Sequence, residues 1–201
     1  MFFTLCVFFT NLSWLPSYLV KERGYTVMKS GLYLTLPYVA ALCGAMAGGY
    51  LGDRTGHRSA VALWTAFLIG PALIGVILSQ DLSMTVLFVS LALFVNAAAF
   101  NGLIVVLFDL LPAEVVGVAA GICIGLFGGL GGVAGPLVLG YAYDHTQSFF
   151  WGFCGIGLSA TLGSLALIPV SLYEKQIKKE KAVRAAGWQA AEQKEAVVET
   201  A

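Results

Sequence analysis

Long apolar runs alternate with short polar or charged segments along most of this chain. Residues 30–52 and 59–80 contain no Asp, Glu, Lys or Arg, and each run is long enough to cross a bilayer as a helix, which takes about 20 residues. The pattern predicts six spanning helices with short connections. The predicted spans are residues 1–20, 30–52, 59–80, 82–108, 115–143 and 148–173.

The composition supports an all-α integral membrane protein. Hydrophobic residues make up 59% of the chain and charged residues 11%, whereas soluble domains carry about 25% charged residues. We expect a six-helix transmembrane domain at residues 1–173 in the lipid bilayer and a charged, water-exposed tail at residues 174–201. The net charge of zero gives no reason to expect nucleic acid as a partner.

Basic residues are divided unevenly between the two sides of the predicted bundle. Six spans place both termini on one side, with eight of the eleven Lys and Arg residues. The other side has Lys21, Arg23 and Lys29. Because basic loops stay in the cytoplasm, we expect cytoplasmic termini and a multi-pass protein of the plasma (inner) membrane.

No catalytic or metal-binding constellation is recognisable in the sequence. The four cysteines lie in apolar runs without a C-x-x-C pair, and the only histidines, His57 and His145, lie in loops. We therefore expect a protein that is not an enzyme and that has no cofactor and no metal site.

Neutral polar and aromatic residues interrupt several spans. Asn11, Trp14 and Tyr18 recur at helical spacing in the first span. An unpaired amide is costly in apolar surroundings, so the asparagines bind either a substrate or a neighbouring helix. The aromatic residues either line a cavity or anchor the helix at the membrane surface. The candidates for a substrate cavity are Asn11, Trp14, Tyr18, Tyr33, Asn96 and Asn101.

Glycines recur at intervals of four in the fifth span. This spacing is typical of helices that pack closely through small residues, here on more than one face. The proline at position 136 is expected to break the helix there. The predicted helix-packing residues are Gly121, Gly125, Gly129, Gly132, Gly135 and Pro136.

The second and fifth spans end on the same pattern, G-Y-x-x-D-x-T, at residues 49–55 and 140–146. The two segments lie on opposite sides of the predicted bundle. Four of the seven positions match. Either turn residues coincide at these two places, or the chain is a three-plus-three inverted repeat, which is typical of transporters and which we expect here.

The loop between the second and third spans is the densest cluster of charge and glycine in the chain. Its charges mark the water boundary, and they either anchor the loop or tie neighbouring helices together. The loop resembles the signature G-x-x-x-D-R-x-G-R-[KR] of the major facilitator superfamily, although His57 stands where Arg or Lys is usual. The matching residues are Gly49, Asp53, Arg54, Gly56 and Arg58. The resemblance implies that they form a cytoplasmic latch that holds one conformation of an alternating-access cycle.

Further segments resemble the C-terminal half of this family. The anion:cation symporter branch of the family has segments similar to residues 14–19 (WLPSYL) and 31–37. The end of that half is similar to residues 109–117 and 131–140. Val116 stands where an Arg is often found.

The resemblance covers residues 1–173 and implies half of a twelve-helix fold. It implies secondary active transport of a small organic anion with a proton or sodium. A missing N-terminal six-helix half, or a second copy of the chain, would complete the transporter, and this half would contribute neutral contacts to the substrate. The alternatives are a half-size transporter acting as a homodimer and a non-transport scaffold or assembly subunit.

Overall fold

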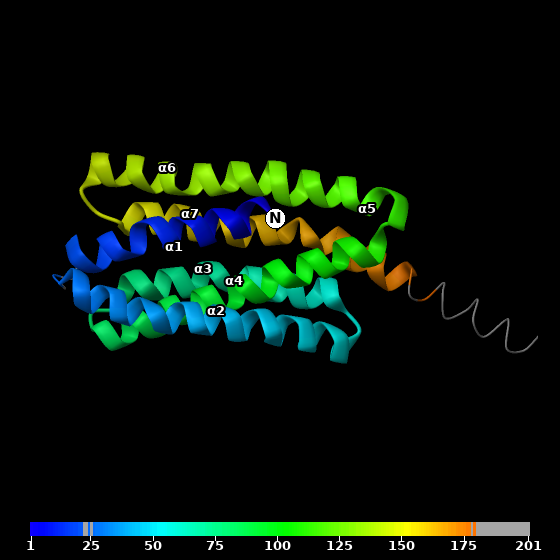
Figure 1. Cartoon of the computed structure of the whole chain (residues 1–201), viewed down its shortest axis with the longest axis horizontal. Helices are drawn as coiled ribbons and strands as arrows, with labels where there is room; N and C mark the ends of the chain where they lie inside the picture. The colour runs from blue at the N-terminus through cyan, green and yellow to red at the C-terminus, as the bar shows by residue number, and fades with distance from the viewer. Residues whose placement is uncertain (22–23, 25, 178, 180–201) are drawn as a thin grey trace, which may run out of the picture.

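The computed structural model of the chain describes residues 1–21, 24, 26–177 and 179, without the side chains of residues 27–32. Most of the predicted tail therefore lies outside the described residues. Within the described part, six helical spans are long and apolar enough to cross a membrane (Figure 1). The elements are α1 (Phe2–Lys21), α2 (Val27–Thr55), α3 (Arg58–Leu78), α4 (Leu82–Leu110), α5 (Ala113–Ala120), the π-helix η1 (Gly121–Phe127), α6 (Gly128–Thr146) and α7 (Phe150–Leu165).

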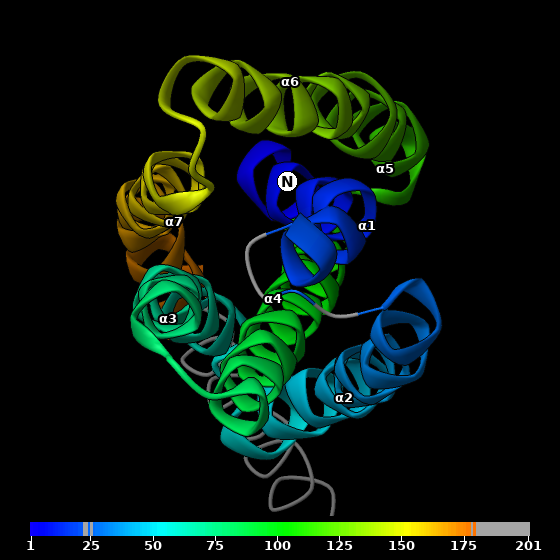
Figure 2. The ribbon, with the colours of Figure 1, turned by 90° about the vertical axis from the view of Figure 1, so that its left-hand side faces the viewer.

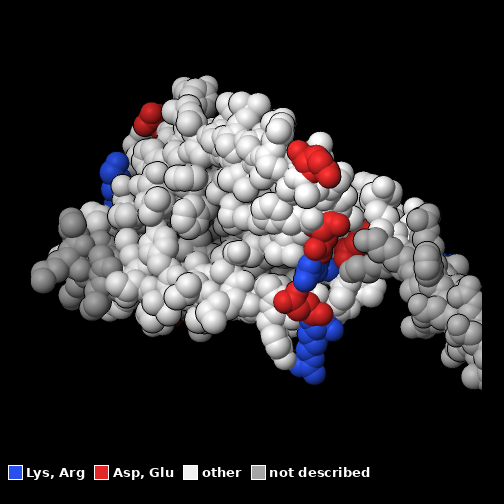
Figure 3. All heavy atoms as spheres, turned by 45° about the vertical axis from the view of Figure 1, so that its right-hand side comes forward, with Lys and Arg blue, Asp and Glu red and all other residues white. Residues whose placement is uncertain are grey.

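Charged side chains gather at the two ends of the bundle. On the face seen in Figure 3, acidic and basic residues lie at either end, and no charge lies between them. Large apolar side chains such as Met46, Trp64 and Leu162 are exposed along the helices, as they are in a protein surrounded by lipid. The chain is thus a multi-pass integral membrane protein. Its two ends are called the Arg58 end and the Lys21 end below.

The helices exchange partners between the two repeats. The first repeat consists of α1, α2 and α3, and the second consists of α4, the fifth span (α5, η1 and α6) and α7. The second helix of each repeat packs on the first helix of the other, so that α2 lies along α4 and α6 lies along α1. The third helices, α3 and α7, pack on one another. Figure 2 shows α1 and α4 in the middle of the bundle, between the α3–α7 pair and the outlying α2 and α6. This exchange confirms the predicted three-plus-three fold.

Two corresponding glycines allow these exchanged helices to touch. A Cβ atom on Gly44 of α2 would lie 2.7 Å from the carbonyl carbon of Phe94 in α4. A Cβ atom on Gly135 of α6 would lie 2.8 Å from the Sγ atom of Cys6 in α1. Gly44 and Gly135 are 91 positions apart, as are Gly49 and Gly140 in the repeated pattern. Close backbone approach through small residues therefore holds both repeats together.

The repeated pattern also ends α2 and α6 in the same way. The hydroxyls of Thr55 and Thr146 donate to the carbonyl oxygens four residues earlier, each over 2.7 Å. The next residues, Gly56 and Gln147, both have positive φ angles, of 65° and 53°. Their N–H groups donate to the carbonyl oxygens of residues 52 and 143. The likeness of the two segments thus extends to individual hydrogen bonds at helix ends.

Two expectations about helix ends are wrong. The helix α6 continues through Pro136 to Thr146, and the irregular backbone of the fifth span lies earlier, at η1. The sixth span continues past Leu165 as helix to Ile177. Glu174, expected to begin an exposed tail, lies in this helix and is only 5% exposed, so the packed domain extends beyond residue 173.

Candidate functional site

A charge bridge joins three helix ends at the Arg58 end. Arg58 begins α3, and its Nη2 atom lies 2.6 Å from Asp53 Oδ1 near the end of α2. Its Nη1 atom donates to Asp109 Oδ2 in the last turn of α4. The guanidinium has several donors in a fixed plane, so it can hold both carboxylates at once. All three side chains remain partly exposed, which allows water to compete for them.

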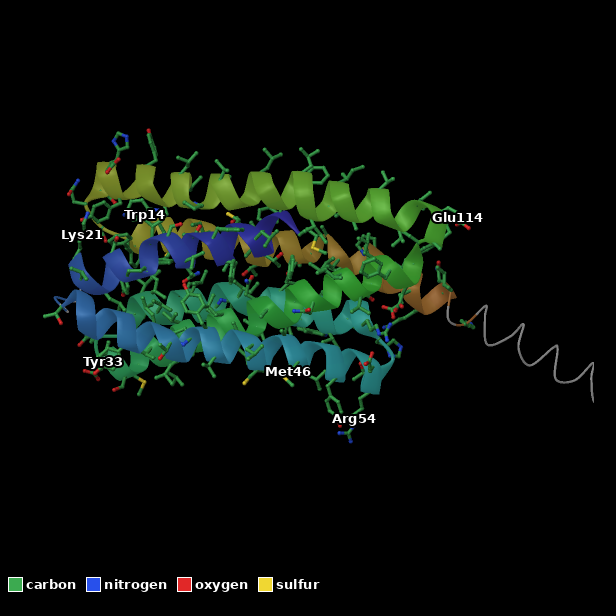
Figure 4. All side chains as sticks on the ribbon, in the orientation of Figure 1. Trp14, Lys21, Tyr33, Met46, Arg54 and Glu114 are labelled. Carbon is green, nitrogen blue, oxygen red and sulfur yellow. The ribbon has the colours of Figure 1, made fainter. Side chains whose placement is uncertain are left out.

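The predicted latch residues divide into two groups. Asp53 and Arg58 come together, and the positive φ angle of Gly56 makes the tight turn between their helices possible. Arg54 instead points away from the bundle (Figure 4), where its Nη1 atom lies 3.4 Å from the hydroxyl of Tyr50. Gly49 has no heavy atom near an added Cβ among the described residues.

Two acidic partners at this end were missed by the sequence analysis. Asp109 completes the Arg58 bridge. Glu174, far along the chain, accepts hydrogen bonds from the backbone N–H of Ser59 over 2.9 Å and from its hydroxyl. Glu174 therefore accepts hydrogen bonds from donors in the first turn of α3 and connects this turn to the last span. The only sequence signal was an acidic residue at the end of an apolar run.

The two buried asparagines of the candidate cavity lie inside the bundle. Asn11 and Asn96 are 1% and 3% exposed. Asn11 Nδ2 donates to the carbonyl oxygen of Val7 in its own helix. The Oδ1 atoms of both asparagines are buried without a hydrogen-bond partner in the described part of the chain. Both side chains are therefore closed off from the surface of the described bundle.

The unpartnered Oδ1 atom predicts an unusual stability change at Asn96. A buried acceptor without a donor costs about 1–3 kcal/mol. We therefore expect Asn96→Val to raise the free energy of unfolding by about 1 kcal/mol, measured by denaturant titration in detergent micelles.

Asn101→Val is the matched control. Asn101 is half-buried, and its Nδ2 atom donates to the Ala97 carbonyl oxygen over 3.0 Å, so this change should bring no gain. A clear loss of stability in Asn96→Val would show that the Asn96 amide has a partner after all.

Trp14 and Tyr18 belong to an aromatic cluster at the Lys21 end. Trp14 lies between α1 and α6 (Figure 4), and its Nε1 atom donates to the Pro136 carbonyl oxygen over 3.0 Å. The rings of Trp14 and Tyr18 both pack edge-on against Phe149, which is fully buried. Lys21 places its Nζ atom 4.7 Å from the ring centre of Tyr143, which in turn packs on Phe149. These contacts hold α1, α6 and α7 together.

Tyr33, by contrast, lines an open pocket between α2 and α4. The pocket has a volume of about 560 Å³ and lies toward the Lys21 end. Its walls are mostly apolar, and Tyr33, Ser83 and Ser90 supply the hydroxyl groups. Among the described side chains, none that lines it is charged. The described part of the pocket wall can therefore take a neutral or hydroxylated group.

The predicted packing glycines also divide into two groups. Gly132 and Gly135 pack against Phe9 and Cys6 of α1. The other three have no heavy atom within 4 Å of an added Cβ in the described part of the chain, and these are Gly121, Gly125 and Gly129. Only the later part of the fifth span therefore packs closely on the bundle. Within the described ranges, no three His, Cys, Asp or Glu side chains come together as metal ligands.

Comparison with known proteins identifies relatives that carry organic acids. The chain is 34% identical over 164 residues to the D-galactonate transporter of Escherichia coli O6:H1, covering 78% of this chain and 37% of that protein. It is 33% identical over 152 residues to a probable galactarate/D-glucarate transporter, GudP, of Pseudomonas putida, covering 70% of this chain and 32% of that protein. It is 28% identical over 172 residues to the hexuronate transporter of Bacillus subtilis, covering 81% and 40%.

The chain thus spans between about a third and two fifths of the length of these relatives. The family model described as Major Facilitator Superfamily matches residues 1–197. Its coverage includes the signature-like loop, the inverted repeat and all six spans. The chain therefore belongs to the major facilitator superfamily.

Proposed function

We propose that this chain forms one half of a secondary active transporter that moves a small organic anion by alternating access. The observation that carries the proposal is the Arg58 bridge, which joins the ends of α2, α3 and α4 through partly exposed charges. Such a bridge can open and close at small cost, because exposed ion pairs contribute only about 0–1 kcal/mol each. The named relatives, which transport sugar acids, supply the substrate class.

The open pocket is the best candidate for substrate contact in this half. Tyr33 and Ser90 offer hydroxyls that match the hydroxyl groups of a sugar acid. Asn101, half-buried on α4, is a further candidate. We propose that Asn11, Trp14, Tyr18 and Asn96 act indirectly, by fixing the helices that carry these contacts. The anionic end of the solute would then bind in the other half, with a proton or sodium as the coupling ion.

The orientation follows from the distribution of basic residues. We place the Arg58 end in the cytoplasm, with both termini, in the plasma (inner) membrane, because basic residues are retained on the cytoplasmic side. The bridge would then close the cytoplasmic end of the path.

Uptake of labelled galactonate and galactarate tests the proposal. The chain is expressed in cells without other sugar-acid carriers, either alone or joined to the six-helix half that completes it. We expect uptake only by the completed protein. Uptake by the chain alone would show that this half suffices, and no uptake by either form would refute transport of these sugar acids.

Within the completed protein, the bridge should affect the rate of uptake. Arg58→Gln removes the charge that binds both Asp53 and Asp109. The conformation that the bridge stabilises then loses two weak ion pairs, so we expect the uptake rate to fall by about tenfold. Arg54→Gln is the matched control, since in the described structure Arg54 reaches only Tyr50. Equal effects of the two changes would contradict the latch.

A further inference from the structure

The outward side of the last span changes from apolar to basic where the span reaches the Arg58 end (Figure 1, orange segment). Leu165, Ile168 and Leu172 are exposed along one side of this helix. Lys175 and Lys179 continue the same side and are also exposed. Their intervals of three and four residues place all five on one stripe of a helix with 3.6 residues per turn. The change from apolar to basic takes about one turn of the helix.

Another side of the same helix fixes the depth of the two lysines. Glu174 is buried and accepts hydrogen bonds from the backbone N–H and the hydroxyl of Ser59, at the start of α3. Ser59 directly follows Arg58, whose partly exposed ion pairs mark the water boundary. Each residue of a helix adds about 1.5 Å, so Lys175 and Lys179 lie within about 8 Å beyond this boundary. The headgroup layer of a bilayer is about 5–8 Å thick on each side, so both lysines lie at the depth of the headgroups.

The ammonium groups of these lysines are free within the described part of the chain. No ion pair there includes Lys175 or Lys179, whereas Arg58 at the same end binds two carboxylates. Tyr173 is exposed beside them. Tyrosine is enriched at this depth of a membrane, because its ring is apolar and its hydroxyl is polar. The segment thus combines an interfacial aromatic ring with two unpaired positive charges.

The sequence continues with further basic residues. Lys178, Lys181 and Arg184 follow, so positions 175–184 hold five basic residues. The same stretch holds one acidic residue, Glu180. Four or more basic residues directly after a membrane-spanning helix are typical of segments that attract anionic lipids. Charge complementarity therefore favours a negatively charged headgroup over a headgroup without net charge.

We propose that Lys175 and Lys179 form a binding site for the phosphate of an anionic phospholipid in the leaflet at the Arg58 end. Two ammonium groups one helical turn apart can donate hydrogen bonds to the oxygens of one phosphate. The acyl chains of this lipid would lie along Leu172 and Ile168, which continue the stripe into the hydrocarbon. The site requires only that the chain is inserted in a membrane, so it does not depend on transport.

Counting bound lipids by native mass spectrometry tests the site. The chain in detergent micelles is titrated with dimyristoyl phosphatidylglycerol, which is anionic, or with dimyristoyl phosphatidylcholine, which has no net charge. We expect the anionic lipid to bind about tenfold more tightly, since each lysine near an anionic surface contributes about fivefold. Lys175→Gln combined with Lys179→Gln should remove most of this preference. Lys175→Arg combined with Lys179→Arg should retain it, because both charges are kept.

Arg54→Gln is the matched control for position, because Arg54 is exposed at the same end but lies on α2. It should leave the preference in place, and a loss as large as that of the double glutamine variant would overturn the site. Equal affinities for the two lipids, or a preference that survives the double glutamine change, would overturn it as well.

Salt provides a second comparison that needs no variant, should the double glutamine variant not fold. Raising the ionic strength from about 0.1 M to about 1 M shortens the screening distance from about 10 Å to about 3 Å. The preference of the unaltered chain for phosphatidylglycerol should then fall to nearly nothing. A preference that salt leaves unchanged would refute a site built on exposed charges.

Discussion

Gly135→Val is expected to separate α6 from α1 and to lower the free energy of unfolding by about 2–3 kcal/mol, the upper range for overpacking. The added side chain would meet the hydroxyl of Thr10 and the backbone carbonyl of Cys6, and that carbonyl cannot move without shifting the helix. Gly44→Val should have a similar effect where α2 meets Phe94. Denaturant titration in detergent micelles measures both changes.

Gly129→Val is the control in the same helix. It adds the same side chain at a position with no heavy atom within 4 Å in the described structure. Because valine forms helix somewhat better than glycine does, this change should leave the free energy of unfolding unchanged or slightly raise it. A loss at Gly129 as large as the loss at Gly135 would mean that the effect of valine does not depend on close packing against α1.

Glu174→Ala should lower the free energy of unfolding by about 2–3 kcal/mol, since it removes a charged acceptor from two donors. The backbone N–H and hydroxyl of Ser59 would lose their partner at a site that is nearly closed to water. The start of α3 should then fray, and trypsin cleavage after Arg58 would report the fraying.

Lys175→Ala provides the comparison, because Lys175 is the exposed neighbour of Glu174 in the same helix. A small effect is expected there. If Glu174→Ala is no more damaging than Lys175→Ala, the hydrogen bonds to Ser59 contribute nothing to stability.

The spans and their symmetry could be predicted because they depend on local sequence. Apolar runs fixed each helix to within a few residues, and the repeated pattern at residues 49–55 and 140–146 predicted the inverted repeat that the exchanged helices confirm. The contact between Asp53 and Arg58 was also within reach, since the two lie in one short loop.

The remaining contacts depend on which helix faces which. Helical spacing relates Asn96 to Asn101 but does not tell which of them points into the bundle, and only Asn96 is buried. The partners Asp109 and Glu174 are distant in sequence from Arg58 and Ser59. The π-helix has no clear sequence signal, since the glycines that mark it are equally typical of close packing.

The ends of α2 and α6 share one backbone geometry, but the contacts beside them differ in chemistry. Phe149 stands 91 positions after Arg58, so the aromatic cluster and the charge bridge occupy corresponding places at opposite ends of the bundle. Dissolved ions screen exposed charges over distances of about 8–10 Å, whereas contacts among neutral rings are not screened. Ionic strength therefore acts on the Arg58 bridge, whereas the contacts between neutral rings at Phe149 do not depend on it. A change in ionic strength would therefore affect the two ends of a symmetric fold unequally.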